Sequence, residues 1–575
     1  MQQINSVDFL KDFHKNGTPV LIEDKEIMNR VDTQKKVIAT GVIVKDCIFN
    51  EVVIFENVDF NCGVKFINCK FKKTLSINEC KSNNYDQEFN FDGYHIEFKK
   101  TEIEGLYFNG SNIIERGVRI SEKSRINRLQ VRSIYSKMGS FAINDSTIEA
   151  QFDISQAKLI NDVEIRNNSI INSKVRFENI TTGSIVFTES TFEKDIHIWA
   201  GKVGSLIFND GVFKDDLNIT AVPISSSTTI FRTEFKKSIV FKLQDDTNKK
   251  TGSLNQVYIS SGKFNEQFIV NGNDEIINEL TINFSQQLEG ALYFDSCKIS
   301  ETKFSGDNYN GNVVLQNCKL NNLSFDSFYN YSTISLISTQ SYGENSEISI
   351  HNSNLGKTHF FSTLLNTFDN IKISNSVLID IIIANVKWFS DKNLNSKTAE
   401  ATLDYTQKKE IYRQIKFALE RQGDRISSLN FKALEMSAYK KELFSKVNKF
   451  KRIFNNNRFI LWVGQTNDFG QNWVKPILFA IGFGILFHFL IVIGISEKLS
   501  YLPNFNKESF LITWNEYYNY FNALPQLMNP VHILKRVFPD NLHISFTVYL
   551  WDYLLKIILA FFIFQVISAF RKYMK

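Results

Sequence analysis

The sequence predicts a mainly β protein: a cytosolic β-solenoid (a parallel β-helix) followed by a helical hairpin and two C-terminal transmembrane helices. Three observations support this fold class. Short apolar segments recur about every eleven residues over most of the chain, the spacing becomes helical after about residue 390, and two long apolar runs lie near the C-terminus. A chain of 575 residues exceeds one hydrophobic core, so several domains are expected.

The changes in spacing divide the chain into four expected parts. They are an N-terminal cap (1–36), a β-solenoid sensor domain (37–390), a helical hairpin that acts as a coupling element (391–445) and a membrane domain (446–575). In the cap, the stretch VDFLKDFHK has the pattern of a short amphipathic helix, which would cover the open first coil. The net charge of +5 is modest and does not by itself indicate a nucleic-acid partner.

The eleven-residue repeat is clearest from Gly41 to Asn84, where four rows align. The second and fourth positions of a row are apolar and the sixth is polar, as in Val42, Val44 and Asp46. Apolar residues two apart point to the same face of a strand, and the polar sixth position is where the chain is expected to turn. Short strands at a fixed spacing predict stacked coils, because a single coil cannot bury its inner face alone.

The same spacing recurs with small variations further along the chain. Apolar–x–apolar pairs begin at Phe141, Phe152, Val163, Val175, Ile185, Ile196, Leu206, Leu217, Leu280, Leu292, Val313 and Leu323, and more weakly at Ile371. The seventh position of the first rows holds Cys47, Cys69 and Cys80. We interpret these cysteines as small buried residues of the stack rather than metal ligands, since the chain has no C-x-x-C pair.

Helical spacing begins near residue 398. Thr398–Glu420 is predicted to be one helix, Gly423 to end it, and Asp424 to cap a second helix at about Ser427–Phe444. The expected stripes are Ile411, Ile415, Ala418 and Leu419 in the first helix and Leu429, Ala433, Met436 and Lys440 in the second. The hairpin is either a plain spacer or an element that couples the solenoid to the membrane.

Two apolar runs, Val474–Ile495 and Phe546–Phe570, are long enough to span a bilayer, which takes about 20 helical residues. Lysine and arginine flank the start of the first run and the end of the second, while the charges of the loop between them balance. The positive-inside rule then predicts that both termini are cytoplasmic. The six cysteines would lie in a reducing compartment and stay free.

The membrane domain has polar and small residues within its spans. Gly484, His488 and Gln565 are the candidate pore-lining residues. Gly484 could instead pack helices closely, and His488 and Gln565 could hydrogen-bond between helices. Asp552 and Lys556 are four residues apart on one helix and are expected to pair. The loop 496–544 is predicted to be interfacial or partly re-entrant. Two helices cannot enclose a pore, so a pore would need several subunits.

One stretch of the solenoid is rich in basic residues. The candidate ligand-binding residues are Arg119, Arg125, Arg128, Arg132, Tyr135 and Lys137. In RLQVR the basic residues alternate with apolar ones, so Arg128 and Arg132 should face outward, where they could bind phosphates while Tyr135 stacks a base. The alternative is a solvated face of a lysine-rich protein.

The sequence gives no sign of catalysis. Phosphate-binding, zinc-protease and serine-hydrolase motifs are absent, and the many aspartates form no diagnostic cluster. We therefore expect no enzyme activity, no catalytic residues, no metal site and no cofactor.

The segments YRQIKFALERQGD and NFKALEMSAYKKE resemble the helical hairpin that follows pentapeptide-like β-helices in bacterial membrane proteins ending in a two-helix, ion-channel-like module. The matching residues are Tyr412, Arg413, Lys416, Gly423, Asp424, Phe431 and Glu435. The domain order also resembles the effector channel of Hailong-type anti-phage systems, in which a nucleotidyltransferase makes single-stranded DNA oligomers that hold the channel closed.

The resemblance implies a ligand-controlled oligomeric ion channel or pore-forming effector of anti-phage defence. It implies a multi-pass protein of the bacterial inner (cell) membrane, a homo-oligomer with a tetramer favoured, a single-stranded DNA oligomer or other polyanion as ligand, and a nucleotidyltransferase partner that makes this ligand. Potassium selectivity is not implied, because no T-V-G-Y-G filter lies in 496–544. The alternative is a membrane-tethered solenoid scaffold without a pore.

Overall fold

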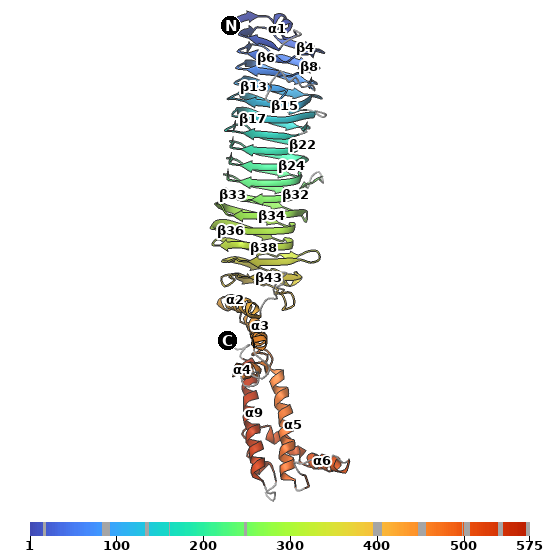
Figure 1. Ribbon diagram of the computed structural model, residues 1–575, viewed down its shortest axis with the longest axis vertical. Coiled ribbons are helices and arrows are strands. Elements are labelled where there is room, and N and C mark those ends of the chain that lie inside the picture. Colours follow the sequence, from blue (N-terminus) through green and yellow to red (C-terminus); the bar gives the residue numbers. More distant parts are fainter. Residues whose placement is uncertain are drawn as a thin grey trace. The chain divides into compact units, whose positions relative to one another are not determined.

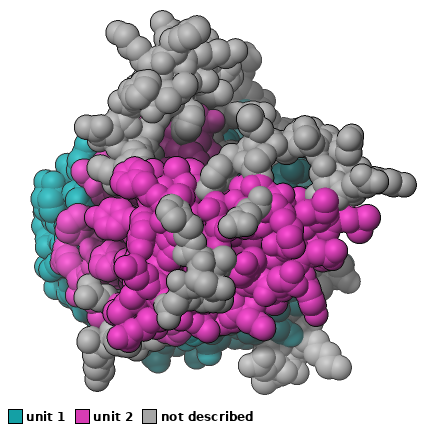
Figure 2. Space-filling model, turned by 90° about the horizontal axis from the view of Figure 1, so that it is seen from below, with its two compact units in different colours: residues 1–396 teal, residues 397–575 magenta. Residues whose placement is uncertain are grey.

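The computed structural model describes residues 1–14, 19–82, 93–132, 137–159, 161–245, 250–394, 405–446, 456–496, 498–499, 507–538 and 544–570. The chain divides into two compact units, residues 1–396 and 397–575, which Figure 2 colours separately. The first unit is a parallel β-solenoid of about 16 turns, and the second is helical. The fold class predicted from the sequence is confirmed.

The coils of the solenoid stack one on the next along the first unit (Figure 1). Within the described residues, 42 strands join in one continuous sheet and two form a separate antiparallel pair, β30 and β31. The first strands are β1 (Gln2–Ile4), β2 (Val20–Glu23), β3 (Lys25–Ile27), β4 (Val31–Gln34), β5 (Val37–Ile38), β6 (Val42–Lys45), β7 (Ile48–Phe49), β8 (Val53–Glu56), β9 (Asp59–Phe60), β10 (Val64–Ile67), β11 (Lys70–Asn78), β12 (Lys81–Ser82), β13 (Ile96–Lys99), β14 (Glu102–Asn109), β15 (Ile113–Ser121), β16 (Arg125–Arg132), β17 (Lys137–Asn144), β18 (Thr147–Ser155), β19 (Lys158–Leu159), β20 (Asp162–Arg166), β21 (Ile170–Ile171) and β22 (Val175–Thr188). The others are β23 (Thr191–Phe192), β24 (Ile196–Asn209), β25 (Val212–Phe213), β26 (Leu217–Thr220), β27 (Pro223–Phe231), β28 (Thr233–Phe235), β29 (Ile239–Lys242), β30 (Gln244–Asp245), β31 (Lys250–Thr251), β32 (Ser253–Ile259), β33 (Gly262–Asn271), β34 (Ile276–Phe284), β35 (Leu288–Asp295), β36 (Lys298–Asn308), β37 (Asn310–Gln316), β38 (Lys319–Asn330), β39 (Thr333–Ile337), β40 (Gln340–Ser341), β41 (Glu347–His351), β42 (Thr358–Phe361), β43 (Asn370–Ser374) and β44 (Ile382–Ala384).

Two eleven-residue rows make one coil. Val42 lies beside Val20 and Val64, which are 22 residues away in either direction. Each coil has four short sides, and we number them from one coil: side one holds β6, side two β7, side three β8 and side four β9. Each strand pairs with the corresponding side of the coils above and below it. Residues that follow one another in sequence therefore travel around the solenoid, and residues about one coil apart align along it.

The core of the solenoid is built from the apolar positions that the repeat predicts. Val42 and Val44 are fully buried, and phenylalanine rings stack between coils inside the solenoid. The centroids of Phe49 and Phe71 lie 4.4 Å apart, and those of Phe192 and Phe213 lie 4.8 Å apart, with nearly parallel planes in both pairs. Such offset contacts add to the hydrophobic gain of burying each ring.

The corners of the first coils have a left-handed backbone conformation at every eleventh residue. Asp46, Asn57, Asn68 and Glu79 have φ values of 50°, 54°, 51° and 50°. Aspartate and asparagine tolerate this region better than most residues, because their short side chains can hydrogen-bond locally. The prediction that the chain turns at the polar sixth position is therefore confirmed.

In many coils a buried hydrogen-bond donor follows the left-handed corner by one or two residues. The Cys69 thiol donates to the carbonyl oxygen of Val44 at 3.3 Å, and the Ser124 hydroxyl donates to that of Phe98 at the same distance. Asn112 donates in the same way to the carbonyl oxygen of Ile77 at 3.2 Å. The cysteines are small and buried as predicted, but they also satisfy corner carbonyls that would otherwise be lost from water.

A short helix closes the N-terminal end of the solenoid. Helix α1 (Ser6–Phe13) begins after Asn5, whose side chain accepts a hydrogen bond from the backbone of Asp8. Phe9 and Phe13 are fully buried, and the ring of Phe13 stacks on Phe55 at 5.3 Å. The first coil already begins with β2, inside the segment 1–36 that the sequence assigns to the cap.

The second unit begins with the predicted helical hairpin, α2 (Tyr405–Arg421) and α3 (Arg425–Lys446). Gly423 has a φ of 79° and Asp424 accepts a hydrogen bond from Ser427, so both predicted caps are confirmed. The predicted stripe of the first helix is buried, but the second helix buries a different face. Its buried residues are Ser428, Phe431, Glu435, Ala438 and Glu442.

Helix α4 (Asn456–Gln465) precedes two long apolar helices, α5 (Val474–Ile495) and α9 (Phe546–Phe570). Both are long and apolar enough to cross a membrane. They lie side by side and antiparallel (Figure 1), with the Trp473 ring at the start of α5 stacked on Phe570 at the end of α9. Between them come α6 (Lys507–Asn519), the 3-10 helix η3 (Phe521–Ala523), α7 (Leu524–Leu527) and α8 (Leu534–Val537).

Candidate functional site

The candidate site is the segment from η3 to α8, which packs between α5 and α9. Its apolar side chains Ala523, Leu527 and Leu534 are buried in one cluster with residues of both long helices. Helix α6 instead projects away from the α5–α9 pair (Figure 1). We call residues 520–533 the inserted segment.

Two contacts fix the inserted segment against α5. His488 Nε2 lies 2.9 Å from the carbonyl oxygen of Tyr520, so this ring nitrogen donates to it. Further along the segment, the Met528 sulfur lies so close to Gly484 that a Cβ at this glycine would clash with it. At a rise of 1.5 Å per residue, Gly484 is about 15 Å from the start of α5 and His488 about 21 Å. The segment therefore reaches about the middle of α5.

A charged cluster fixes the end of the inserted segment to α9. His532 Nε2 lies 2.5 Å from Asp552 Oδ1, and the Lys556 ammonium lies 2.7 Å from the other carboxylate oxygen. His532 Nδ1 lies 2.6 Å from the carbonyl oxygen of Asn529. The predicted Asp552–Lys556 pair is confirmed, whereas His532 was missed, because no local pattern links it to a helix twenty residues later.

The three residues predicted to line a pore all contact their own chain. Gly484 lies under Met528, and His488 has no exposed surface. Gln565 is 6% exposed, and its carbonyl oxygen accepts a hydrogen bond from the Asn467 amide at 3.3 Å. The structure thus places these residues in contacts within the chain, and pore lining by them stays a prediction.

The turn at 466–472 connects the hairpin to α9, and we call it the elbow. On one side, the Gln471 side chain donates to the carbonyl oxygen of Leu429 in α3 at 2.7 Å. On the other side, Asn467 donates to Gln565 of α9. The elbow is therefore hydrogen-bonded to both α3 and α9.

The seam of the hairpin contains four of the seven residues that carry the family resemblance, Tyr412, Lys416, Phe431 and Glu435. Tyr412 is fully buried and its ring contacts that of Phe431 at 6.1 Å. The Lys416 ammonium lies 2.8 Å from the Glu435 carboxylate, and this pair is largely buried. A second ion pair, Lys409–Glu442 at 2.6 Å, lies further along the same seam.

The basic stretch of the solenoid does not form one stripe. Arg119 lies on side one, Arg125 on side two, Arg128 and Arg132 on side three, and Lys137 on side four. The reason is that these residues span nearly one coil of the chain and so pass around the solenoid. Arg128 and Arg132 do face outward, as predicted, with Leu129 and Val131 buried between them. Tyr135 lies outside the described residues.

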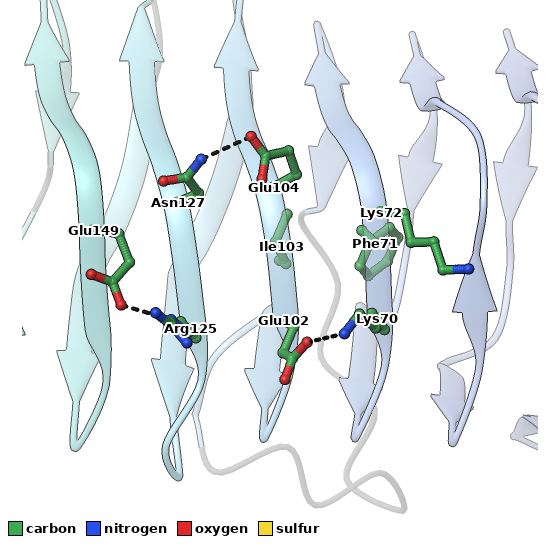
Figure 3. Close-up of a pocket in the computed structure, with 9 residues that line it drawn as sticks. All are labelled: Lys70, Phe71, Lys72, Glu102, Ile103, Glu104, Arg125, Asn127 and Glu149. Atoms are coloured by element: carbon green, nitrogen blue, oxygen red, sulfur yellow. Dashed lines mark hydrogen bonds and ion pairs between the residues drawn. The ribbon is translucent and has the colours of Figure 1, made fainter.

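Carboxylates of neighbouring coils oppose the arginines. The ion-pair distances are 2.6 Å for Arg125–Glu149, 3.1 Å for Arg128–Glu104 and 3.6 Å for Arg132–Asp153. Arg125 also lines a shallow groove of about 470 Å³ (Figure 3). Its lining includes three cationic residues, Lys70, Lys72 and Arg125, and three carboxylates, Glu102, Glu104 and Glu149, so the charges around the groove balance.

Burial keeps some of the solenoid thiols neutral. Burial raises the pKa of Cys80 to about 12, and burial also raises the pKa of Cys69. Among the six cysteines, Cys62 is half-buried and the other five are buried. The described residues contain no group of three or more histidine, cysteine, aspartate or glutamate side chains that could hold a metal ion.

No protein-family model, curated protein or solved structure matches this chain.

Proposed function

We propose that the chain is one subunit of an oligomeric membrane channel or pore-forming effector that acts in anti-phage defence. In this proposal α5 and α9 cross the bacterial inner membrane, both termini are cytoplasmic, and an anionic ligand on the cytosolic solenoid controls opening. The phage-defence role, the single-stranded DNA ligand, the tetramer and the nucleotidyltransferase partner rest on the family resemblance of the hairpin and of the domain order.

The inserted segment is the observation that carries the channel proposal. Two helices that only anchor a soluble domain need no polypeptide between them. Here the chain enters between α5 and α9 as far as Gly484 and returns to Asp552, with non-helical backbone from Asn529 to Ile533. Irregular backbone at membrane depth is tolerated only where protein covers it or where it lines a water-filled cavity. Several copies arranged around an axis would supply both the protein that covers this backbone and a water-filled cavity.

The elbow supports control from the cytosolic side. The hairpin, the elbow and α9 are joined by the Gln471–Leu429 and Asn467–Gln565 hydrogen bonds. These bonds connect α3 to the end of one candidate span, which favours a coupling element over a plain spacer.

The ligand part of the proposal requires a rearrangement of ion pairs. Arg125, Arg128 and Arg132 are exposed, but each has a carboxylate neighbour. A polyanion would have to displace these partners, and it would release counterions as it bound. Replacing the three arginines by glutamate should abolish oligonucleotide binding, and binding to the wild type should fall steeply with salt. Arg232→Glu, which removes an exposed arginine paired with Asp210 on another coil, is the matched control.

Electrical recording tests the proposal. The purified full-length protein in planar bilayers should produce discrete currents when the ligand does not hold it closed, and its expression should depolarise cells. The triple arginine variant should be constitutively toxic if the ligand closes the channel and inert if the ligand opens it. Silence in every ligand state would instead favour the membrane-tethered scaffold.

A further inference from the structure

We infer that three amide side chains of the inserted segment, Asn522, Gln526 and Asn529, line the narrow part of the pore. We call them the amide stripe. This inference rests on the proposed channel function and deepens it, because it names the surface that ions would pass. The inference is based on a row of exposed amides on a segment whose other side is buried against the middle of α5.

The amide stripe begins on short helices. Asn522 in η3 and Gln526 in α7 are four residues apart, as on successive turns of a helix, and Asn529 follows in the bend after α7. Ala523 and Leu527, which alternate with them, are buried in the apolar cluster against α5 and α9. All three amides are exposed in the single chain. The segment therefore buries Ala523 and Leu527 against its own subunit and exposes the amides, together with the apolar side chains of Phe521, Val531 and Ile533.

The depth of the amide stripe decides what can cover it. Met528, between Gln526 and Asn529, lies against Gly484 near the middle of α5. Lipid at that depth offers no hydrogen bond to an amide, and leaving polar groups unpaired there costs several kcal/mol each. The exposed surfaces of α5 and α9 are apolar instead, with Leu478 and Phe564 more than half exposed. Water can hydrogen-bond to the amides, whereas lipid or another copy of the chain can cover the apolar faces of α5 and α9.

His532 is a positioning residue for this stripe. Both of its ring nitrogens face acceptors, the carbonyl oxygen of Asn529 and the carboxylate of Asp552. The charged groups around it are Asp552 and Lys556 on α9. This network fixes the carbonyl group of Asn529, which is the last residue of the amide stripe.

Cysteine scanning can test the inference, because all six native cysteines precede residue 319 and the helical unit has none. In the full-length Cys62→Ser protein, which lacks the most accessible thiol, we would introduce Gln526→Cys, Asn529→Cys or His488→Cys. A charged, membrane-impermeant methanethiosulfonate reagent is then added during recording, and its covalent attachment is measured by mass spectrometry. Asn529 accepts a hydrogen bond from the backbone of Val531, so Gln526→Cys serves as the variant that leaves this turn intact.

The expected result is attachment at positions 526 and 529 with loss of most of the current. The reagent should not attach to His488→Cys, because this position is buried within the chain. Attachment at 526 and 529 without loss of current, or no attachment in a conducting protein, would overturn the inference. Failure of the proposed function looks different, since the Cys62→Ser protein itself would then carry no current.

A charge exchange at one position gives an independent readout. In asymmetric salt, Gln526→Glu should shift the reversal potential toward the cation equilibrium potential and Gln526→Lys toward that of the anion. Fixed charge in a narrow, low-dielectric passage acts strongly on ions, whereas a structural disturbance would not depend on the sign of the charge. Equal shifts for the two variants would overturn the inference.

Discussion

Removing the charge of Lys416 tests whether the buried ion pair of the hairpin holds α2 against α3. The Lys416 and Glu435 side chains are 16% and 9% exposed, and their charged atoms are 2.8 Å apart. Lys416→Met keeps the length of the aliphatic side chain but leaves the Glu435 carboxylate without its cation. A matched control exists in the same helix, because the Glu410–Arg413 pair also measures 2.8 Å but is 41% and 54% exposed.

The expected magnitudes differ because the two pairs differ in burial. Breaking a buried pair by removing one partner costs about 3–5 kcal/mol, and the partial exposure of Lys416 favours the lower value. An exposed pair is worth at most about 1 kcal/mol. The double variant Lys416→Met with Glu435→Leu removes both charges, so it should recover most of the loss. If the effect comes from charge rather than packing, the wild type is the most stable, the double variant is less stable, and Lys416→Met is the least stable.

Amide hydrogen exchange of the detergent-solubilised full-length protein, read by mass spectrometry over α2 and α3, measures this locally. A loss of about 3 kcal/mol corresponds to exchange faster by roughly a hundredfold in Lys416→Met, whereas Arg413→Met should change it less than about tenfold. The reasoning is refuted if the two single variants exchange at the same rate. It is also refuted if the double variant is as destabilised as Lys416→Met, since the loss would then come from packing.

Three further predictions follow from other contacts. At pH 8, iodoacetamide should modify Cys62 and leave Cys80 unmodified, because the Cys80 pKa is raised from 9.0 to about 12. The neutral Cys80 thiol contributes stability below pH 9, and this contribution is lost as the pH rises toward 12. A Cys80→Ser variant should therefore lack this component of the alkaline unfolding curve. Gly484→Ala should displace the Met528 side chain and lower the stability by about 1–3 kcal/mol, measured as a lower melting temperature and an altered conductance. Gly482→Ala should be neutral, because a Cβ added at Gly482 has no atom within 4 Å. Asn467→Leu should remove the hydrogen bond to the Gln565 carbonyl and lower the stability by about 1–3 kcal/mol. It should also weaken the response of the current to ligand without changing the affinity for ligand at a solenoid site. An unchanged response would exclude the elbow as the coupling route.

Local periodicity was enough to predict the fold class. The apolar positions of the repeat are the buried ones, the polar sixth positions adopt the left-handed conformation, and the two apolar runs match α5 and α9 residue for residue. Each of these features depends on residues close in sequence. The predicted caps at Gly423 and Asp424 were right for the same reason, since a helix end is specified within a few residues.

The features that the sequence did not reveal depend on how distant segments meet. The row length of eleven residues does not say how many rows complete a coil, so Arg119, Arg128 and Lys137 could not be assigned to different sides before the 22-residue register was known. The inserted segment combines short helices with irregular backbone, and its position follows from Met528 on α5 and His532 on α9. Neither contact leaves a periodic signal in the sequence.

The polarity of the exposed surfaces in the helical unit indicates how copies of it would be arranged. Lipid can cover the apolar side chains exposed on α5 and α9, such as Leu478 and Phe564, but it cannot cover the amides of Gln526 and Asn529 near the middle of α5. A single chain would therefore expose unpaired polar groups to hydrocarbon. A cyclic assembly that turns the inserted segments toward its axis satisfies the amides with water and leaves the apolar faces to lipid and to neighbouring copies. In our proposal, the chemistry of the inserted segment therefore supplies a reason for an oligomer and for its orientation that does not use the family resemblance.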